Sequence, residues 1–424
     1  MKNIEKEVKD YWHKLGPGLT TGASDDDPSG IATYSQAGAK YGFQLMWLSV
    51  ITFPLMSVVQ EMCARIGIVT GQGLAANIRK YFPRRLLYIC TTLLLLANIF
   101  NIGADLGAMA SAVKLLLPNF PFWLAVIFFG LLSIILEVFI VYREYAKYLK
   151  YLALVLFAYV FSALLIHMDW SQVFYHTFVP HIVFSKEQIL LICGILGTTI
   201  SPYLFFWQTS QEVEEEIVAG QDTVEKRVSF TNDKEIKDMR VDVWSGMFIS
   251  NVVMFFIIAT CGAVLHASGI TNITTAADAA RALHPIAGDF SYALFAIGII
   301  GTGMLAIPVL AGSAAYAVAE SFRFKEGLYL KLKDAYAFYA VIAIAILVGI
   351  ILNFVGLDPI KALLYSAVGN GLVSPVVLYF IVKIASSKKI MGERANKRST
   401  NYIGWLTVGL MTVSALAVIV QFFV

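Results

Sequence analysis

The sequence predicts an all-α integral membrane protein, in which two groups of five transmembrane helices repeat with opposite orientation and an eleventh helix follows. Three observations predict this fold class. The 424-residue chain is 58% hydrophobic and only 14% charged, whereas a soluble domain is about half apolar and about a quarter charged. Apolar runs of about 20 residues recur along the chain. Two of these runs are interrupted by helix-breaking residues, as in transporters with an inverted repeat.

Eleven apolar runs are long enough to cross a bilayer. They cover residues 18–40, 43–68, 86–112, 121–141, 149–167, 188–211, 241–265, 289–322, 335–354, 359–382 and 402–423. With a cytoplasmic N-terminus, 27 of the 32 Lys and Arg residues fall in segments on the cytoplasmic side, as the positive-inside rule requires. One missed span would place every later loop on the opposite side of the membrane, and the basic residues would then be divided between both sides. The asymmetry therefore supports eleven spans, a cytoplasmic N-terminus and an external C-terminus.

We expect a single membrane domain over residues 1–424. Five spans precede the second interrupted run, and this odd number gives the second group of five the opposite orientation. The first repeat is therefore 18–167, the second is 188–382, and 402–423 is an additional helix. The stretch from Glu212 to Arg240 is dense in charges of both signs, which predicts a solvated cytoplasmic linker that can include a short helix.

Composition and motifs argue against several classes of function. The net charge of +3 gives no reason to expect a nucleic-acid partner. A Walker sequence and a nucleophile–base set are both absent from the sequence, so we expect neither an ATP-driven pump nor an enzyme, and no cofactor. The cysteines lie singly in apolar runs, which predicts small buried residues instead of disulfides or a zinc site: Cys63, Cys90, Cys193 and Cys261.

The first interrupted run contains three consecutive carboxylates, Asp25, Asp26 and Asp27, followed by Pro28 and Gly30. Charge and free backbone groups are costly at bilayer depth, so this segment must line an ionic or wet space. Pro28 and Gly30 release carbonyl groups that can face a cation, and we expect Asp27 to be the principal ligand. Capping of the following half-helix is an alternative role compatible with ion binding. Successive helical residues point in different directions, so Asp25 and Asp26 are expected beside the pathway.

The second interrupted run places hydroxyl groups around a proline. Thr198, Thr199, Ser201 and Tyr203 surround Pro202, and each offers oxygen, which suits Mg²⁺, Ca²⁺ or Mn²⁺ better than softer metals. We expect these four residues to line the same site as Asp27. The alternative is that the hydroxyls only satisfy backbone groups released by the proline.

Other acids, among them Glu137, also lie within the spans. Asp105 is a lone carboxylate among small residues, and an intramembrane acid is expected to serve the pathway, although a structural hydrogen bond to a neighbouring helix is the alternative. Glu61 precedes Arg65 by one helical turn, which predicts an ion pair. Glu320 similarly precedes Arg323 near a cytoplasmic end and is expected to pair with it or to extend toward the interface.

Histidines avoid the middle of the predicted membrane. Five of the six histidines fall in predicted external segments, which weakens a proton relay built on imidazole: His167, His176, His181, His266 and His284.

The two interrupted runs and their surroundings resemble a known family. Asp27-Pro28-Ser29-Gly30, then Tyr41-Gly42, then Gln60 and the segment from Ala64 to Gly71 (Ala-Arg-Ile-Gly-Ile-Val-Thr-Gly), are similar to the natural resistance-associated macrophage protein (NRAMP) family of divalent metal transporters. The resemblance implies the inverted-repeat fold of LeuT-like transporters, with broken helices 1 and 6.

The sequence departs from the usual pattern of that family at several positions. The family has asparagine where this chain has Gly30, and Met-Pro-His where it has Ser201-Pro202-Tyr203. Asp105 matches the aspartate of the third span, but the acid usually found one turn later is Ala108. This combination resembles the NRAMP-related magnesium transporter branch, in which soft-metal selectivity and proton coupling are altered.

The resemblance implies uptake of Mg²⁺, and also of Mn²⁺, as a largely hydrated ion without obligatory proton coupling. The first alternative is a proton-coupled Mn²⁺/Fe²⁺ transporter of the ordinary NRAMP type. The second is a Na⁺-coupled amino-acid symporter of the same architecture, in which half-helix N-termini would bind the substrate carboxylate. The transported ion and the bilayer are the expected partners. We expect a monomer in a prokaryotic plasma membrane.

Overall fold

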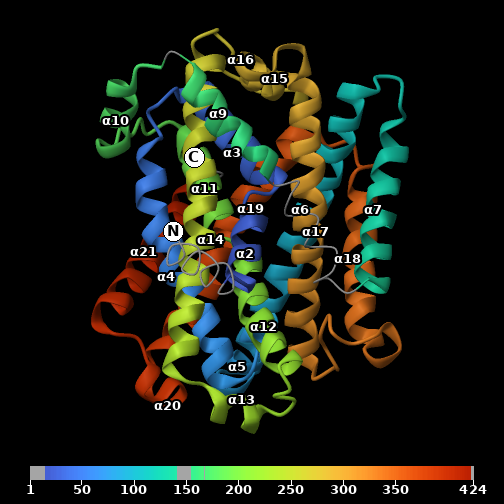
Figure 1. Cartoon of the computed structure of the whole chain (residues 1–424), viewed down its shortest axis with the longest axis vertical. Coiled ribbons are helices and arrows are strands. Elements are labelled where there is room, and N and C mark those ends of the chain that lie inside the picture. Colours follow the sequence, from blue (N-terminus) through green and yellow to red (C-terminus); the bar gives the residue numbers. More distant parts are fainter. Residues whose placement is uncertain (1–14, 141–153, 167, 422–424) are drawn as a thin grey trace, which may run out of the picture.

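The computed structural model describes residues 15–140, 154–166 and 168–421, and in these ranges the chain is helical and contains no strand. Figure 1 shows long helices running roughly parallel to one direction, with short helices at both ends. This confirms the all-α fold class that the apolar runs predict.

The helices follow the predicted spans closely. The first part of the chain forms α2 (Pro17–Asp25), α3 (Pro28–Tyr41), α4 (Trp47–Thr70), α5 (Leu74–Tyr81), α6 (Arg84–Leu116), α7 (Phe122–Phe139), η1 (Leu154–Leu156), α9 (Phe157–Leu165) and α10 (Trp170–Phe178). The second part forms α11 (Lys186–Thr199), α12 (Pro202–Val218), α13 (Val224–Phe230), α14 (Asp233–Cys261), the π-helical segment η2 (Gly262–His266), α15 (Ala276–Ala280), η3 (Arg281–Leu283) and α16 (His284–Ala287). The last part forms α17 (Ser291–Phe322), α18 (Tyr336–Leu352), α19 (Pro359–Ser386), α20 (Lys388–Met391) and α21 (Arg398–Gln421).

Both predicted interruptions are present. The first span is divided between α2 and α3, with Asp26 and Asp27 between them, and α11 and α12 are separated by Ile200 and Ser201. In the described ranges, eight helices are long and apolar enough to cross a membrane, and α18 is a shorter apolar helix of 17 residues. The predicted fifth span, 149–167, begins and ends outside the described residues.

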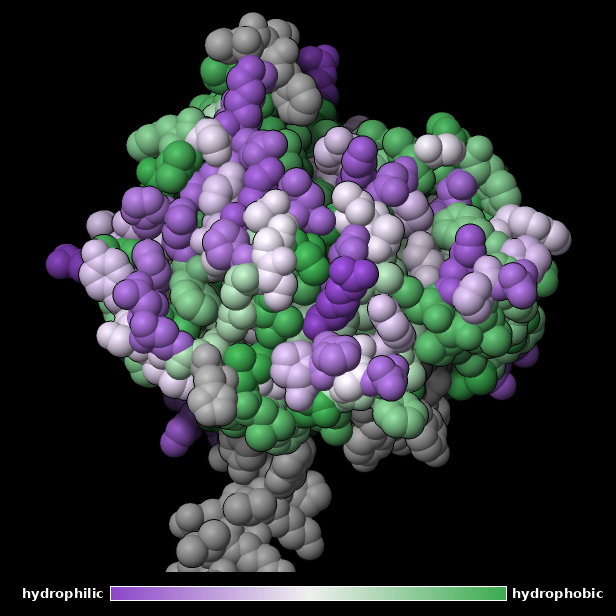
Figure 2. Space-filling view, turned by 90° about the horizontal axis from the view of Figure 1, so that it is seen from above, coloured by the Kyte–Doolittle hydropathy of each residue, from purple (hydrophilic) through white to green (hydrophobic). Residues whose placement is uncertain are grey.

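The two ends of the bundle carry different short helices. We call the upper end in Figure 1, which carries α10, α15 and α16, the α10 end, and the lower end, which carries α5, α13 and α20, the α5 end. Figure 2 views the molecule from above and shows hydrophilic side chains gathered over the middle of this face, with hydrophobic side chains concentrated toward its edge. An apolar perimeter around a more polar end is the distribution that a bilayer requires.

The helix α2 packs against α14 through bare backbone. A Cβ atom on Gly22 would lie 2.3 Å from the carbonyl oxygen of Gly246, and a Cβ atom on Gly246 would lie 2.2 Å from the carbonyl oxygen of Gly18. Glycine is therefore required at these contacts. The carboxylate of Asp242 on α14 accepts hydrogen bonds from the backbone N–H groups of Gly16, Gly18 and Leu19, and so caps the N-terminus of α2 from another helix.

The predicted ion pair between Glu61 and Arg65 is wrong. Glu61 instead accepts a hydrogen bond from Arg240 of α14 at 2.8 Å. Arg65 donates to the backbone carbonyl of Arg394 at 2.7 Å. The two side chains point to different neighbouring helices because tertiary partners with good geometry outcompete a weak pair along one helix.

The predicted pairing of Glu320 with Arg323 is also wrong. Glu320 is buried and accepts hydrogen bonds from the backbone N–H of Ala76 at 2.7 Å and the hydroxyl of Ser210 at 3.3 Å. It therefore caps the N-terminus of α5, which no side chain at Gly73 can do. Arg323 ends α17 in the left-handed conformation, with φ of 62°.

The stretch from Glu212 to Arg240 is more ordered than a solvated linker. Helix α12 continues to Val218, the expected short helix is α13, and α14 begins at Asp233. The buried side chain of Arg227 donates to the carbonyl oxygen of Gly71 at 3.0 Å, so this segment is docked on the bundle. The four predicted buried cysteines are all buried and unpaired.

Candidate functional site

Asp27 begins the second half of the first broken helix. Its Oδ1 accepts hydrogen bonds from the hydroxyl of Ser29 at 2.7 Å and the backbone N–H of Gly30 at 2.7 Å. Pro28 occupies the first helical position, where its missing N–H costs nothing. The capping role considered for Asp27 is therefore realised, and it fixes the carboxylate at the positive end of α3.

A carboxamide links Asp27 to Asp105. The Nδ2 group of Asn101 donates to Asp27 Oδ2 at 2.8 Å and lies 3.2 Å from Asp105 Oδ2. All three side chains are at most 1% exposed. The sequence did not distinguish Asn101 from the other amides within the spans, although its position four residues before Asp105 places both on one face of α6. The structure thus adds Asn101 to the candidate site.

Asp25 and Asp26 are buried as deeply as Asp27. They are 0% and 3% exposed. Asp25 ends α2, and its Oδ2 accepts from the hydroxyl of Ser250 on α14 at 2.6 Å. Among the described residues, Oδ1 of Asp25 and Oδ1 of Asp26 have no hydrogen-bond partner. Adjacent buried carboxylates repel one another and lose hydration, so this break strongly favours a cation or bound protons.

The hydroxyls of the second break serve its own backbone. Ser201 Oγ lies 2.9 Å from the Gly197 carbonyl oxygen and 2.6 Å from that of Thr198, and Thr199 Oγ1 donates to Ile195 at 2.8 Å. Backbone satisfaction, the alternative given for these residues, therefore occurs. A hydroxyl that donates its proton keeps its lone pairs, so these oxygens can still accept a cation or a water molecule.

The two breaks are in direct contact. The hydroxyl of Tyr203, on α12, donates to the carbonyl oxygen of Ser24 at 3.1 Å, which satisfies one of the last carbonyls of α2. A Cβ atom on Gly30 would lie only 3.1 Å from Thr198 Oγ1. Gly30 therefore provides space for the opposite break and contributes no side-chain donor of its own.

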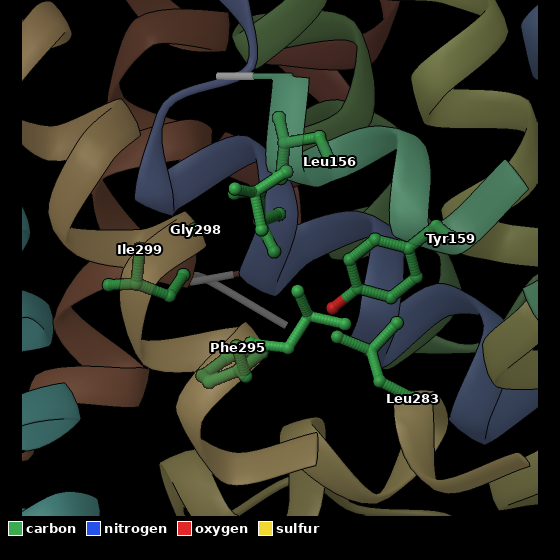
Figure 3. A pocket seen from close by; sticks show the side chains of 9 residues that line it. Leu156, Tyr159, Leu283, Phe295, Gly298 and Ile299 are labelled. Carbon is green, nitrogen blue, oxygen red and sulfur yellow. The ribbon is translucent and has the colours of Figure 1, made fainter. Parts of the chain in front are cut away.

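An apolar layer covers α3 just beyond this site. Ile31 follows Gly30 and lines a cavity of about 10 Å³, which is space for about one water molecule. Figure 3 shows Leu156, Phe295 and Ile299 around this cavity, with the hydroxyl of Tyr159 turned toward it. Since the carboxylates are also almost fully buried, this conformation is closed around the two breaks.

The donors at the breaks are carboxylate, hydroxyl and carbonyl oxygens. In the described part of the chain, no three His, Cys, Asp or Glu side chains form a group arranged to hold a metal ion. A cation bound here would need oxygens from the backbone, hydroxyls or water in addition to the acids, and such oxygen donors suit hard divalent ions.

Comparisons with known proteins agree with this architecture. A family model described as natural resistance-associated macrophage protein-like matches residues 18–421. A protein of Caldanaerobacter subterraneus named divalent metal cation transporter MntH is 27% identical over 421 residues, with 96% of this chain and 92% of the relative covered. The protein of the same name from Klebsiella pneumoniae subsp. pneumoniae is 26% identical over 405 residues, covering 94% and 91%.

Solved structures show the same fold. The manganese transporter of Eremococcus coleocola, crystallised with an aromatic bis-isothiourea compound, superposes with a TM-score of 0.75 at 21% identity, covering 96% of this chain and 86% of that one. Mhp1, a nucleobase-cation-symport-1 family transporter, superposes with a TM-score of 0.57 at 15% identity, covering 96% and 91%. The match of the family model over nearly the whole chain establishes that this multi-pass membrane protein belongs to the natural resistance-associated macrophage protein-like family, whose members are transporters and not enzymes.

Proposed function

We propose that the protein is a transporter of divalent cations that carries Mg²⁺, and also Mn²⁺, as a largely hydrated ion without obligatory proton coupling. Its relatives carry the names divalent metal cation transporter and manganese transporter. We propose Asp27 as the principal ligand, with Gly30, Thr198, Thr199, Ser201 and Tyr203 around the ion and Asp25, Asp26 and Asp105 beside it.

The observation that carries the choice of Mg²⁺ is the small number of lone pairs that Asp27 has available. A carboxylate has about four acceptor positions. Two donors occupy Oδ1 and one occupies Oδ2, so about one position is open to an ion. A single direct contact suits Mg²⁺, which loses water reluctantly and is usually held through one or two carboxylates with several waters retained.

The second break supports the same choice. Ser201 and Tyr203 supply hydroxyl oxygens at the positions where the family pattern has a thioether and an imidazole. Soft and borderline ligands favour late transition metals, so their replacement removes an advantage that Mn²⁺ or Fe²⁺ would have over abundant Mg²⁺. We propose no proton coupling because the membrane potential alone can drive entry, at about 4.6 kcal/mol for a divalent ion at 100 mV.

The rival function with a specific observation in its favour is proton-coupled Mn²⁺/Fe²⁺ transport. Asp105 is a second buried carboxylate, linked to Asp27 through Asn101, and such an acid could exchange a proton as an ion binds. The amino-acid symporter is disfavoured because the buried acids at the first break would repel a substrate carboxylate.

The test is Mg²⁺ and Mn²⁺ uptake into proteoliposomes at an imposed potential, with simultaneous measurement of lumenal pH. We expect saturable Mg²⁺ uptake with a flat pH trace and no uptake by Asp27→Ala. Asp358→Ala is the matched control, because Asp358 also caps a helix before a proline, α19, and accepts from the Lys361 N–H at 2.9 Å at an exposed position. Acidification that follows Mn²⁺ uptake stoichiometrically, without Mg²⁺ uptake, would establish the rival function.

A further inference from the structure

Two of the histidines that the sequence assigns to external segments line one cavity. It has a volume of about 380 Å³ and lies at the α10 end, where α10 approaches the end of α3 and the π-helical segment η2. Its lining includes Gln44, Met168, Asp169, His176, Gly262 and His266. None of the residues proposed for ion transport belongs to this lining. We refer to it as the histidine cavity.

His266 is held as a metal-binding imidazole would be. Its Nδ1 lies 2.9 Å from the carbonyl oxygen of Ala39 in the last turn of α3. Since a carbonyl can only accept, Nδ1 carries the proton, and in the neutral ring Nε2 has a free lone pair. Nε2 faces Gly42, 3.5 Å from the position of an added Cβ atom, and Gly42 lines the cavity. Metal-ligating histidines typically donate their other ring N–H to a carbonyl or carboxylate in this way.

The cavity also contains buried polar atoms that lack partners. Among the described residues, Nδ1 of His176 on α10 and Oε1 of Gln44 are buried without a hydrogen-bond partner. Buried polar atoms are nearly always satisfied, so each such atom requires an explanation. Rotation of the His176 ring or of the Gln44 amide toward the cavity would allow a ligand there to satisfy these atoms.

The available donors select a class of ion. Oδ1 of Asp169 accepts from the backbone N–H groups of Ser171 and Gln172 at the start of α10, and its other carboxylate oxygen keeps its acceptor positions. The donors of the lining include two imidazoles, one amide oxygen, one carboxylate and the thioether of Met168. Imidazole suits Zn²⁺, Ni²⁺ and similar borderline ions, whereas Mg²⁺ prefers an all-oxygen shell. The histidine cavity and the two helix breaks therefore suit different metals.

We propose that the histidine cavity is a second cation site, in which His266 Nε2 and His176 Nδ1 bind a borderline divalent ion such as Zn²⁺, with Gln44 or water completing the shell. The two imidazoles come from η2 and α10. Ligands lie within about 2.1 Å of Zn²⁺, so binding draws these two elements together beside the end of α3. Occupancy therefore restrains the α10 end and inhibits transport, which extends the proposed function without determining it.

The first test measures Zn²⁺ binding to the purified full-length protein by calorimetry in excess Mg²⁺. We expect binding that weakens at least tenfold in His176→Ala and in His266→Gln, and that weakens as pH falls because protons compete for imidazole. Glutamine at 266 can still donate to Ala39, so this variant separates metal binding from capping of α3. His181→Ala and His284→Ala, at exposed positions outside the cavity, are expected to bind as the parent does.

Two outcomes would overturn the proposal. Equal Zn²⁺ affinity in the parent, His176→Ala and His266→Gln would mean that Zn²⁺ binds elsewhere. Loss of binding in Asp27→Ala would place the ion at the helix breaks. Calorimetry measures Zn²⁺ binding and not transport, so these outcomes do not depend on whether the protein transports Mg²⁺. If the protein transports Mg²⁺, Zn²⁺ added at the α10 end should slow Mg²⁺ uptake by the parent. The same addition should have no effect on Mg²⁺ uptake by His176→Ala.

Discussion

The carboxylate of Asp242 on α14 accepts a hydrogen bond from the backbone N–H of Gly18 on α2 at 2.6 Å, although the two residues are 224 positions apart in sequence. Two further N–H groups, of Gly16 and Leu19, donate to its other oxygen at 2.8 and 3.0 Å. The first half of the broken helix, α2, thus depends on α14 for its N-terminal cap. This relationship fixes the start of α2 against α14.

Asp242→Ala should detach this cap and destabilise the protein by about 2–4 kcal/mol, because hydrogen bonds to a charged group contribute about 1.5–3 kcal/mol each and are not additive. Asp242→Asn keeps one acceptor oxygen and should lose less. Thermal unfolding in detergent measures both. Glu225→Gln, which neutralises an exposed acid on α13, serves as the control and should leave the unfolding temperature unchanged.

Asn101→Ala should raise the Mg²⁺ concentration required for half-maximal uptake by about 10–100-fold, the usual effect of removing a group that orients a metal ligand. The substitution leaves Asp27 Oδ2 and Asp105 Oδ2 without their shared donor. The control is Asn98→Ala, one turn earlier on α6, since Asn98 donates to Leu310 and Ser313 instead of to the acids. Similar uptake curves for both variants would argue against the orienting role.

Gly30→Ala should reduce transport, because its Cβ atom would lie 3.1 Å from Thr198 Oγ1 and would require Thr198 to shift by a few tenths of an ångström. Thr198→Ala removes the opposing atom, so the double variant should recover part of the lost activity. Initial uptake rates of the two single variants and the double variant form a double-mutant cycle. An additive loss would show that the contact does not limit transport.

The buried side chain of Glu326 should make the stability of the protein decrease as pH rises. Burial, reinforced by the nearby acid Glu320, raises the pKa of Glu326 to about 10, although Arg79 acts in the opposite direction. The folded state therefore holds a proton that the unfolded chain releases above its ordinary pKa of 4.5, so stability contributed by this group falls as pH rises from about 4.5 to about 10. Glu326→Gln should raise the unfolding temperature at pH 8 and change it little at pH 4.5. An equal shift at both values would contradict this account.

Sequence patterns predicted the helices and both breaks because apolar length, proline and intramembrane charge act locally. The position of Asp27 at the first break was predictable for the same reason, and its role as an ion ligand stays a prediction. The role of Asn101 could not be predicted, because its significance depends on α3 lying beside α6. The partners of Glu61 and Glu320 were not predicted for a related reason. Both side chains accept hydrogen bonds from groups far away in sequence, and the spacing of residues along one helix does not predict such contacts.

The glycine contact between α2 and α14 has a mechanical consequence. Side chains that interlock resist rotation of one helix on another, but Gly18, Gly22 and Gly246 present only smooth backbone to each other. At these three glycines, α2 can therefore move away from α14 without withdrawing a side chain from between the two helices. The resistance to tilting is then concentrated in a few hydrogen bonds at its two ends: those to Asp242 at its start, and those from Ser250 to Asp25 and from Tyr203 to Ser24 at its end.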